Sequence, residues 1–228
     1  MASSKFLLWD IDGTLIRGAR HAAEAFKAVL REVYELDSEI LRITTAGKTD
    51  PQIVRETLLL HNLAHEAISE RMPAFQRAYL AAAHQIAPQM RESIEVLPGV
   101  RAALGRLAPR VIHSLLTGNF LETARLKLDA AGLSRWFAWE YGAFGSDHEH
   151  RAELVPIALE RVAAVGAFDR RDVVVIGDTP NDIACARAAG VRVIAVATGS
   201  FDQAALAAAD AVLPNLNDLD ALERAVFD

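Results

Sequence analysis

Five short runs of apolar residues recur along the chain, and each is nearly continuous rather than alternating. They are residues 5–9, 110–116, 172–176, 191–196 and 210–213. Strands of a parallel sheet show this pattern because helices cover both faces of the sheet and leave no polar side. We therefore predict five strands of a buried parallel sheet.

Helical patterns lie between the later strands, in residues 119–132, 152–166 and 181–190. Strands that alternate with helices indicate an α/β fold with right-handed crossover connections. In such folds ligands bind beyond the carboxyl ends of the strands. The chemistry of this protein is therefore expected in the loops that follow the predicted strands.

Residues 17–95 differ from the rest of the chain, because they read as helices throughout and show no clear strand pattern. The segment LPGV at residues 97–100 marks the return of alternating strands and helices. The simplest interpretation is a helical insertion placed after the first strand.

The first predicted strand ends on two carboxylates. Asp10 and Asp12 are two positions apart, so they would face the same side of an extended chain. Like charges this close repel each other and raise one pKa, unless a cation or a proton lies between them. The pair therefore either caps a solvated turn or shares a metal ion.

Further polar residues follow the later strands or precede a predicted helix, and they offer carboxylates, a hydroxyl, backbone amides and a cation. They are Thr117, Gly118, Asn119, Arg151, Asp178 and Asp182. Mg²⁺ prefers oxygen ligands and usually takes a few carboxylates plus substrate phosphate. Hydroxyl, amide and guanidinium donors neutralise the equatorial oxygens of a transferring phosphoryl group. The set indicates metal-assisted phosphoryl transfer.

Charge and composition narrow the partners. The 228 residues include 24 Lys and Arg against 30 Asp and Glu, with a net charge of −6 and no basic run, which argues against nucleic acid. The single cysteine, Cys185, excludes an intramolecular disulfide and suits a reducing compartment. No apolar run is long enough to span a bilayer. We expect a soluble cytoplasmic protein that acts on a small molecule, with no membrane partner.

The sequence resembles the phosphatase branch of the haloacid dehalogenase superfamily over nearly its whole length. The motifs that carry the resemblance are DIDGT at residues 10–14, LLTGN at 115–119, Arg151, and GDTPND at 177–182. The resemblance implies a Rossmann-like parallel sheet core formed by residues 1–16 and 96–228. Residues 17–95 would then be an inserted helical cap domain.

The resemblance also implies an activity, the Mg²⁺-dependent hydrolysis of a small phosphomonoester, as in phosphoglycolate phosphatases. Asp10 would be the nucleophile that forms an aspartyl-phosphate, and Asp12 the general acid for the leaving group and later the base for water. Thr117, with the backbone amides of Gly118 and Asn119, would hold the phosphoryl group.

The resemblance to this superfamily also implies which residues bind the metal. Asp10, the Asp12 carbonyl and Asp178 would bind Mg²⁺, and Asp182 would be a further ligand or lie beside one. The third motif departs from the family, which usually has lysine there. Arg151 would supply the charge through a planar fork.

Other cations remain as alternatives to Arg151. These are Lys48, Lys127 and Arg125. Lys48 lies in TTAGKTD at residues 44–50, which mimics the end of a phosphate-binding P-loop, but Arg42 stands where that motif requires glycine. We keep Gly47, Lys48 and Asp50 as cap-loop residues that reach the substrate, with Lys48 as the one that binds it, against the alternative of a polar loop between helices.

Two other functions stay open on the sequence. A sugar phosphomutase of the same superfamily uses the same two aspartates and differs mainly in its cap. A phospho-acceptor or binding module of the response-regulator kind also combines acidic residues, a threonine and a cation on a parallel sheet. The sequence names neither the substrate nor the oligomeric state.

Overall fold

Six parallel strands form the central sheet in a computed structural model that describes residues 5–36, 40, 43–164 and 169–228. Their order across the sheet is β5-β4-β1-β6-β7-β8. The strands are β1 (Lys5–Trp9), β4 (Val111–Thr117), β5 (Ala143–Phe144), β6 (Val173–Gly177), β7 (Arg192–Val196) and β8 (Ala211–Leu213). β1 pairs in parallel with β4 on one side and with β6 on the other, so the first strand of the chain lies inside the sheet.

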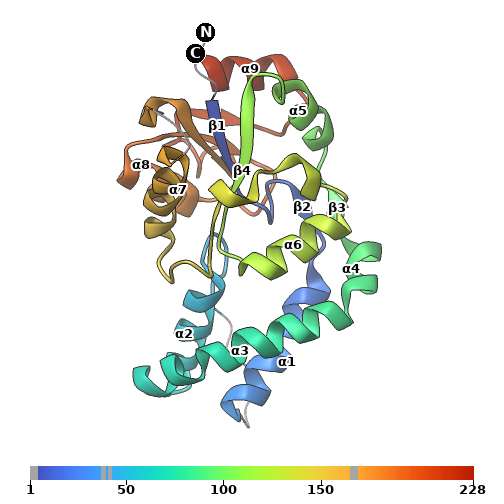
Figure 1. The fold of residues 1–228 in the computed structure, drawn as a ribbon, viewed down its shortest axis with the longest axis vertical. Coiled ribbons are helices and arrows are strands. Elements are labelled where there is room, and N and C mark those ends of the chain that lie inside the picture. Colours follow the sequence, from blue (N-terminus) through green and yellow to red (C-terminus); the bar gives the residue numbers. More distant parts are fainter. Residues whose placement is uncertain (1–4, 37–39, 41–42, 165–168) are drawn as a thin grey trace.

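Helices cover both faces of this sheet (Figure 1). They are α5 (Val100–Leu107), α6 (Leu121–Ala130), α7 (Leu154–Ala163), α8 (Pro180–Ala189) and α9 (Leu219–Phe227). Leu7 and Trp9 of β1 belong to the apolar cluster shared with α5, α6 and α9, whereas Phe6 and Leu8 belong to the cluster shared with α7 and α8. Successive residues of a strand face opposite sides of the sheet, and helices cover both sides, so all four side chains are fully buried. The predicted α/β fold with a parallel sheet is confirmed.

The helices of the insertion that the structure describes lie at one end of the molecule, next to α6 (Figure 1). They are α1 (Arg20–Tyr34), α2 (Asp50–Leu60), α3 (His65–Gln85) and α4 (Ala87–Ser93). They have an apolar core of their own, in which the rings of Phe26, Phe75 and Tyr79 pack against one another. Phe120, at the start of α6, joins this cluster and ties the insertion to the sheet.

A short antiparallel ribbon lies where the chain enters and leaves the insertion. It consists of β2 (Ile16–Arg17) and β3 (Glu95–Val96), in which Ile16 faces Val96. Neither strand is in the sequence prediction, nor is β5, because two residues are too few to show any periodicity. In the part of the chain that the structure describes, four 3₁₀ turns complete the elements: η1 (Ser134–Trp136), η2 (Trp139–Tyr141), η3 (Arg151–Glu153) and η4 (Arg170–Asp172).

The five predicted strands agree with the structure to within about one residue at each end. The predicted helix 152–166 begins as η3 and continues as α7, and its residues 165 and 166 lie outside the described residues. Within the described ranges no helix combines the length and apolar character needed to cross a membrane.

Candidate active site

Three neighbouring strands end at the same edge of the sheet, and each end carries a residue of the candidate site. Asp10 follows β1, Thr117 ends β4, and Asp178 follows β6. The backbone N–H of Asp10 donates to the carbonyl of Ile176 at 2.9 Å, which extends the pairing of β1 with β6 into the site. Parallel strands share the edge at which their carboxyl ends lie, so these distant residues meet there.

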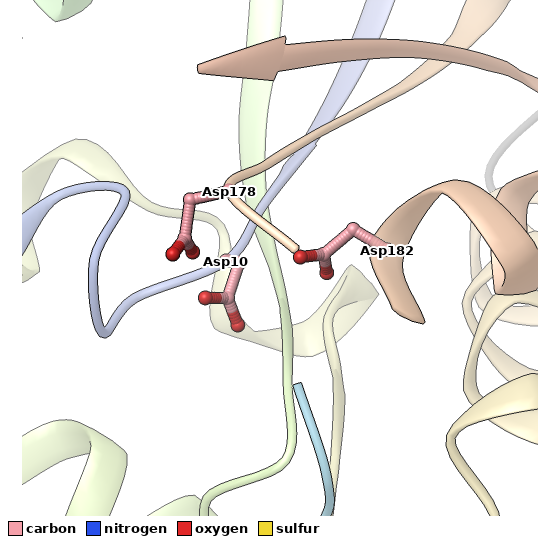
Figure 2. A group of neighbouring side chains, drawn as sticks. All are labelled: Asp10, Asp178 and Asp182. Carbon is pink, nitrogen blue, oxygen red and sulfur yellow. The ribbon is translucent and has the colours of Figure 1, made fainter. Parts of the chain in front are cut away.

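The carboxylates of Asp10, Asp178 and Asp182 converge in this place (Figure 2). One oxygen of each lies within 4.8 Å of the other two, and all three residues are buried. Burial, followed by repulsion from neighbouring carboxylates, raises the pKa of Asp10 and of Asp178 well above the ordinary carboxyl value, although Arg151 opposes the rise. Buried like charges need a cation beside them, and Mg²⁺ prefers oxygen ligands. The donor set therefore fits a divalent cation.

Arg151 lies against these carboxylates. It begins η3, and its side chain is only 6% exposed. One terminal guanidinium nitrogen donates to Asp10 Oδ1 at 2.9 Å and also to Asp182. The buried Nε has no hydrogen-bond partner among the described residues. The residue that stands at the third motif thus contacts the acidic group directly.

Asp182 has two structural partners besides the acidic group. Its Oδ2 accepts from the backbone N–H and the hydroxyl of Thr179, at 3.0 and 2.7 Å, which forms a capping box at the start of α8. Its Oδ1 accepts from Arg151. Because both oxygens already have donors, this geometry suits a residue that orients Arg151 beside a metal better than one that binds the metal directly.

Asp178 is held in a narrow cradle. The hydroxyl of Thr14 donates to its Oδ1 at 3.1 Å. A Cβ atom at Gly13 or at Gly199 would overlap the carboxylate, so only glycine fits at these positions. The sequence interpretation gave Thr14 and Gly199 no role, although Thr14 stands inside the first motif.

The position of Asp12 differs from the sequence prediction that Asp10 and Asp12 face the same side. The Asp12 carboxylate is not among the three that converge, because the strand ends at Trp9 and its alternation does not reach Asp12. Its Oδ2 accepts instead from Asn119 Nδ2 at 2.8 Å and from Lys127 Nζ at 2.6 Å. The strand alternation used for the expectation does not extend beyond the strand.

The loop after β4 carries Thr117, Gly118 and Asn119. The Oγ1 atom of Thr117 accepts from the side-chain amide of Asn119 at 2.8 Å and from its backbone N–H at 3.3 Å. Both bonds use the oxygen as acceptor, so the hydroxyl hydrogen remains available to a ligand. Gly118 packs against the backbone of Lys48 and accepts from the N–H of Asp50 at 2.7 Å, which docks the insertion onto this loop.

Lys48 lies on that docked loop and lines the site, but its ammonium group pairs with Glu56. Of the two other alternative cations, Arg125 lies over the ring of Trp139 at 4.8 Å. Lys127 alone among the three reaches the acidic residues of the strand ends, through Asp12. Sequence reasoning named Lys127 only as an alternative, because nothing in the pattern of a helix indicates which distant loop a lysine reaches.

A cavity of about 850 Å³ lies between the strand ends and the helical insertion. Its polar part includes Asp10, Asp12 and Arg151, and the side formed by the insertion is largely apolar, with Phe26 and Ile53 among its residues. Asp50 also lines it, and burial raises the pKa of this carboxyl to about 6, opposed by the charge of Lys127. The cavity can hold a ligand whose charged end meets the strand ends and whose remainder meets the insertion.

Residues 5–190 match the family model of haloacid dehalogenase-like hydrolases. The chain belongs to this family. A phosphoglycolate phosphatase of Pseudomonas syringae pv. tomato is 30% identical over 202 residues, which are 86% of this chain and 70% of that protein. Phosphoglycolate phosphatase 1 of Pseudomonas aeruginosa is 27% identical over 94% of this chain and 78% of its own length. The family and these relatives make the protein a phosphatase, that is, a phosphoric monoester hydrolase.

Solved structures share the fold. A hydrolase from Pseudomonas syringae superimposes with a TM-score of 0.67 at 20% identity, over 97% of this chain and 99% of that one. CbbY from Rhodobacter sphaeroides, in complex with phosphate, gives a TM-score of 0.66 at 18% identity, over 97% and 100% of the two chains. These likenesses support the Rossmann-like core.

Proposed function

We propose that the protein is a Mg²⁺-dependent phosphatase that hydrolyses a small phosphomonoester through an aspartyl-phosphate on Asp10. The observation that supports this most directly is the convergence of three buried carboxylates with Arg151 at the carboxyl ends of the strands. Asp10, Asp178 and the backbone carbonyl of Asp12 would hold Mg²⁺, with Asp182 beside them. When bound, the ion would offset the charge of the carboxylates and of the substrate phosphate.

In the first half of the reaction Asp10 attacks phosphorus. Arg151 bonds to Oδ1 of Asp10, and Oδ2 accepts no hydrogen bond among the described residues, which favours Oδ2 as the attacking atom. The bond between phosphorus and the alcohol oxygen breaks as the new bond forms. Asp12 donates a proton to the departing oxygen, so that an alcohol leaves rather than an alkoxide.

In the second half a water molecule attacks the phosphorus of the aspartyl-phosphate. Asp12, now a carboxylate, accepts the proton of this water, and Asp10 leaves as a free carboxylate. The hydroxyl of Thr117 and the guanidinium group of Arg151 would donate to the phosphoryl oxygens, where negative charge develops. Inorganic phosphate is released, and both aspartates return to their starting protonation states.

The substrate belongs to the small phosphorylated metabolites, as the names of the relatives suggest. Phosphoglycolate is the first candidate because two relatives are phosphoglycolate phosphatases. The cavity of about 850 Å³ also admits larger phosphomonoesters. Lys48 is the cap-loop residue that we propose to approach the bound substrate, after release from Glu56.

A panel of phosphorylated metabolites with Mg²⁺, followed by release of inorganic phosphate, tests this function. Steady release over many turnovers of at least one phosphomonoester is expected, and Asp10→Asn should retain less than a few per cent of the rate. One phosphate retained per chain would indicate a phospho-acceptor module instead. Isomerisation of a sugar phosphate without release of phosphate would indicate a phosphomutase.

The remaining parts of the proposal concern partners and location. The net charge of −6 without a basic run supports the absence of a nucleic-acid partner. The buried, unpaired Cys185 suits a cytoplasmic location. Gel filtration at several protein concentrations would measure the oligomeric state.

A further inference from the structure

Lys127 makes a contact in the site that none of the four motifs accounts for. It lies in the last turn of α6, and the residue is only 6% exposed. Its Nζ donates to Asp12 Oδ2 at 2.6 Å and to Asn119 Oδ1 at 2.6 Å. A lysine is rarely buried to this extent unless its charge is paired.

The contacts of Lys127 form a closed network with the loop after β4. Asn119 receives a hydrogen bond from Lys127 on its oxygen and gives two from its amide nitrogen, to Asp12 at 2.8 Å and to Thr117 at 2.8 Å. Asp12 Oδ2 therefore has two donors, one charged and one neutral. Charge-assisted hydrogen bonds of this length are among the strong ones.

The side chain of Asp12 depends on these two donors for a fixed position, because little else surrounds it. Asp12 lies beyond the strand, in an isolated bridge with Ile16, and its side chain is 41% exposed, whereas that of Asp10 is 8% exposed. An exposed carboxylate can adopt several rotamers. General acid catalysis requires that it lie within hydrogen-bond reach of the leaving oxygen.

We propose that Lys127 is the positioning residue for Asp12. Lys127 and Asn119 together hold the Asp12 carboxylate in one rotamer at the carboxyl ends of the strands. The proton of Asp12 is then already placed for transfer to the leaving oxygen. The Asn119 amide links this acid to Thr117, so that the leaving group and the phosphoryl group are aligned by one network. This inference rests on the proposed function.

A leaving-group comparison tests the role. The substitution Lys127→Met keeps the aliphatic stem and removes the charge. For an alkyl phosphomonoester that the wild type hydrolyses, kcat should fall by roughly tenfold or more, which is part of the 10²–10⁴-fold that general acid catalysis typically contributes. For p-nitrophenyl phosphate, whose leaving group needs no proton, kcat should fall by less than about threefold. KM should change little for either substrate.

A double-mutant cycle shows whether Lys127 acts through Asp12. In the background of Asp12→Asn, the further change Lys127→Met should cost almost nothing on the alkyl ester, because coupled residues are not additive. Arg125→Met is the matched control on the same helix, since that guanidinium packs on Trp139 and not on the site. Its kinetics should equal those of the wild type.

The outcomes separate this inference from the proposed function. Equal losses on both esters, a rise in KM alone, full additivity in the cycle, or unchanged kinetics would each overturn the role of Lys127 while the phosphatase function stands. A wild type that releases phosphate from no member of the metabolite panel would overturn both. Should Lys127→Met fail to fold by circular dichroism, Lys127→Arg carries the test. It keeps the charge in a different geometry, and a smaller loss confined to the alkyl ester is expected.

Discussion

At the scale of single residues, the site concentrates negative charge where water is almost absent. Asp10 and Asp182 share one guanidinium, that of Arg151, and the side chains of all three are less than 10% exposed. A single positive charge cannot balance two or three buried carboxylates, so the site stays electrostatically incomplete without a further cation. The functional residues are thus also the residues that limit stability.

Substitution of Arg151 tests whether it supplies the positive charge for phosphoryl transfer. Arg151→Ala should lower kcat by about 10²–10³, the typical effect of losing one donor that acts in the transition state. Arg151→Lys should recover a good part of the activity, because it restores the charge. Recovery should be incomplete, because a compact ammonium group replaces the planar guanidinium whose terminal nitrogen contacts both Asp10 and Asp182. Steady-state kinetics of the purified variants measure both effects.

The opposite result is equally informative. If Arg151 only supported the start of α7, the alanine variant would turn over at a near-normal rate and only its stability would change. Lys127 would then be the remaining cation in contact with the strand-end carboxylates among the described residues.

At the scale of elements, β4 links the buried sheet to the helical insertion. Its inner part is fixed by His113, whose Nδ1 accepts from Trp9 Nε1 at 3.0 Å and whose Nε2 lies 3.0 Å from the carbonyl of Leu104. Its carboxyl end opens into the loop of Gly118, where the insertion docks. β4 therefore carries His113, which contributes to stability, and leads into Gly118, which contacts the insertion beside the site.

His113 should make stability depend on pH. Burial lowers its pKa from 6.5 to about 4, and the hydrogen bond to the Leu104 carbonyl only partly opposes this. As the pH falls from 6.5 to 4, the unfolded chain takes up a proton that the folded protein does not, so stability present above pH 6.5 is lost. The loss is on the order of 3 kcal/mol.

Urea unfolding between pH 7.5 and 4 measures this contribution. His113→Gln should be less stable than the wild type at pH 7.5, and the difference between the two proteins should shrink toward pH 4. His84→Gln, at an exposed position of α3, is the control and should keep the slope of the wild type. A constant difference between wild type and His113→Gln at every pH would contradict the expectation.

Gly118 should be required for the docked position of the insertion. A Cβ atom there would overlap the backbone of Lys48 and Thr49, so Gly118→Ala should push the loop away and break the bond from the Asp50 N–H. A misplacement of about 1 Å in a site can cost on the order of 10²-fold in rate. We expect a large fall in kcat/KM on the natural class of substrate, with less than about 2 kcal/mol lost in stability.

Gly105→Ala is the matched control. This glycine lies inside α5, and an added Cβ would meet only a ring atom of Trp136 at 3.7 Å, an ordinary contact. The substitution should leave the kinetics unchanged and stabilise the protein by about 0.5–1 kcal/mol, because alanine favours the helix. Equal kinetics for the two alanine variants would show that the contact at Gly118 has no function.

At the scale of the whole molecule, the site exists only where two parts of the chain meet. The strand ends supply the charged groups, and the helices of residues 20–93 supply the largely apolar side of the cavity. We propose the division into a core of residues 1–16 and 96–228 and a cap of residues 17–95, and the ribbon of β2 with β3 lies at its boundary. Charge chemistry and substrate selection would then belong to different parts of the fold.

Metal binding should be visible as stability of the whole molecule. Mg²⁺ at a hundred times its dissociation constant should stabilise the protein by about 2.7 kcal/mol, since it binds only the folded state. Asp178→Asn should abolish this gain, and should raise the thermal midpoint of the metal-free protein, because it removes one of three crowded carboxylates. Asp129→Asn, at an exposed position of α6, is the control and should respond to Mg²⁺ as the wild type does. A thermal midpoint that Mg²⁺ leaves unchanged would contradict the proposed metal site.

The sequence by itself determined the sheet, the insertion and the residues that gather at the strand ends. Continuous apolar runs are a local property, so the five longer strands could be located from neighbouring residues alone. Asp10, Thr117 and Asp178 follow such strands, and the geometry of a parallel sheet then requires that they meet. Strands of two residues, such as β5, show no period and escaped prediction.

Only the tertiary structure decided the direction of Asp12, the contact of Lys127 with it and the cradle of Asp178. β1 ends at Trp9, so its alternation does not align Asp12 with Asp10. The packing of whole elements brings Asp12 to Lys127 and Asp178 to Gly199. No short-range sequence pattern indicates that residues so far apart in the chain lie close together. Backbone conformation depends mainly on near neighbours, whereas the approach of two side chains depends on every element that lies between them.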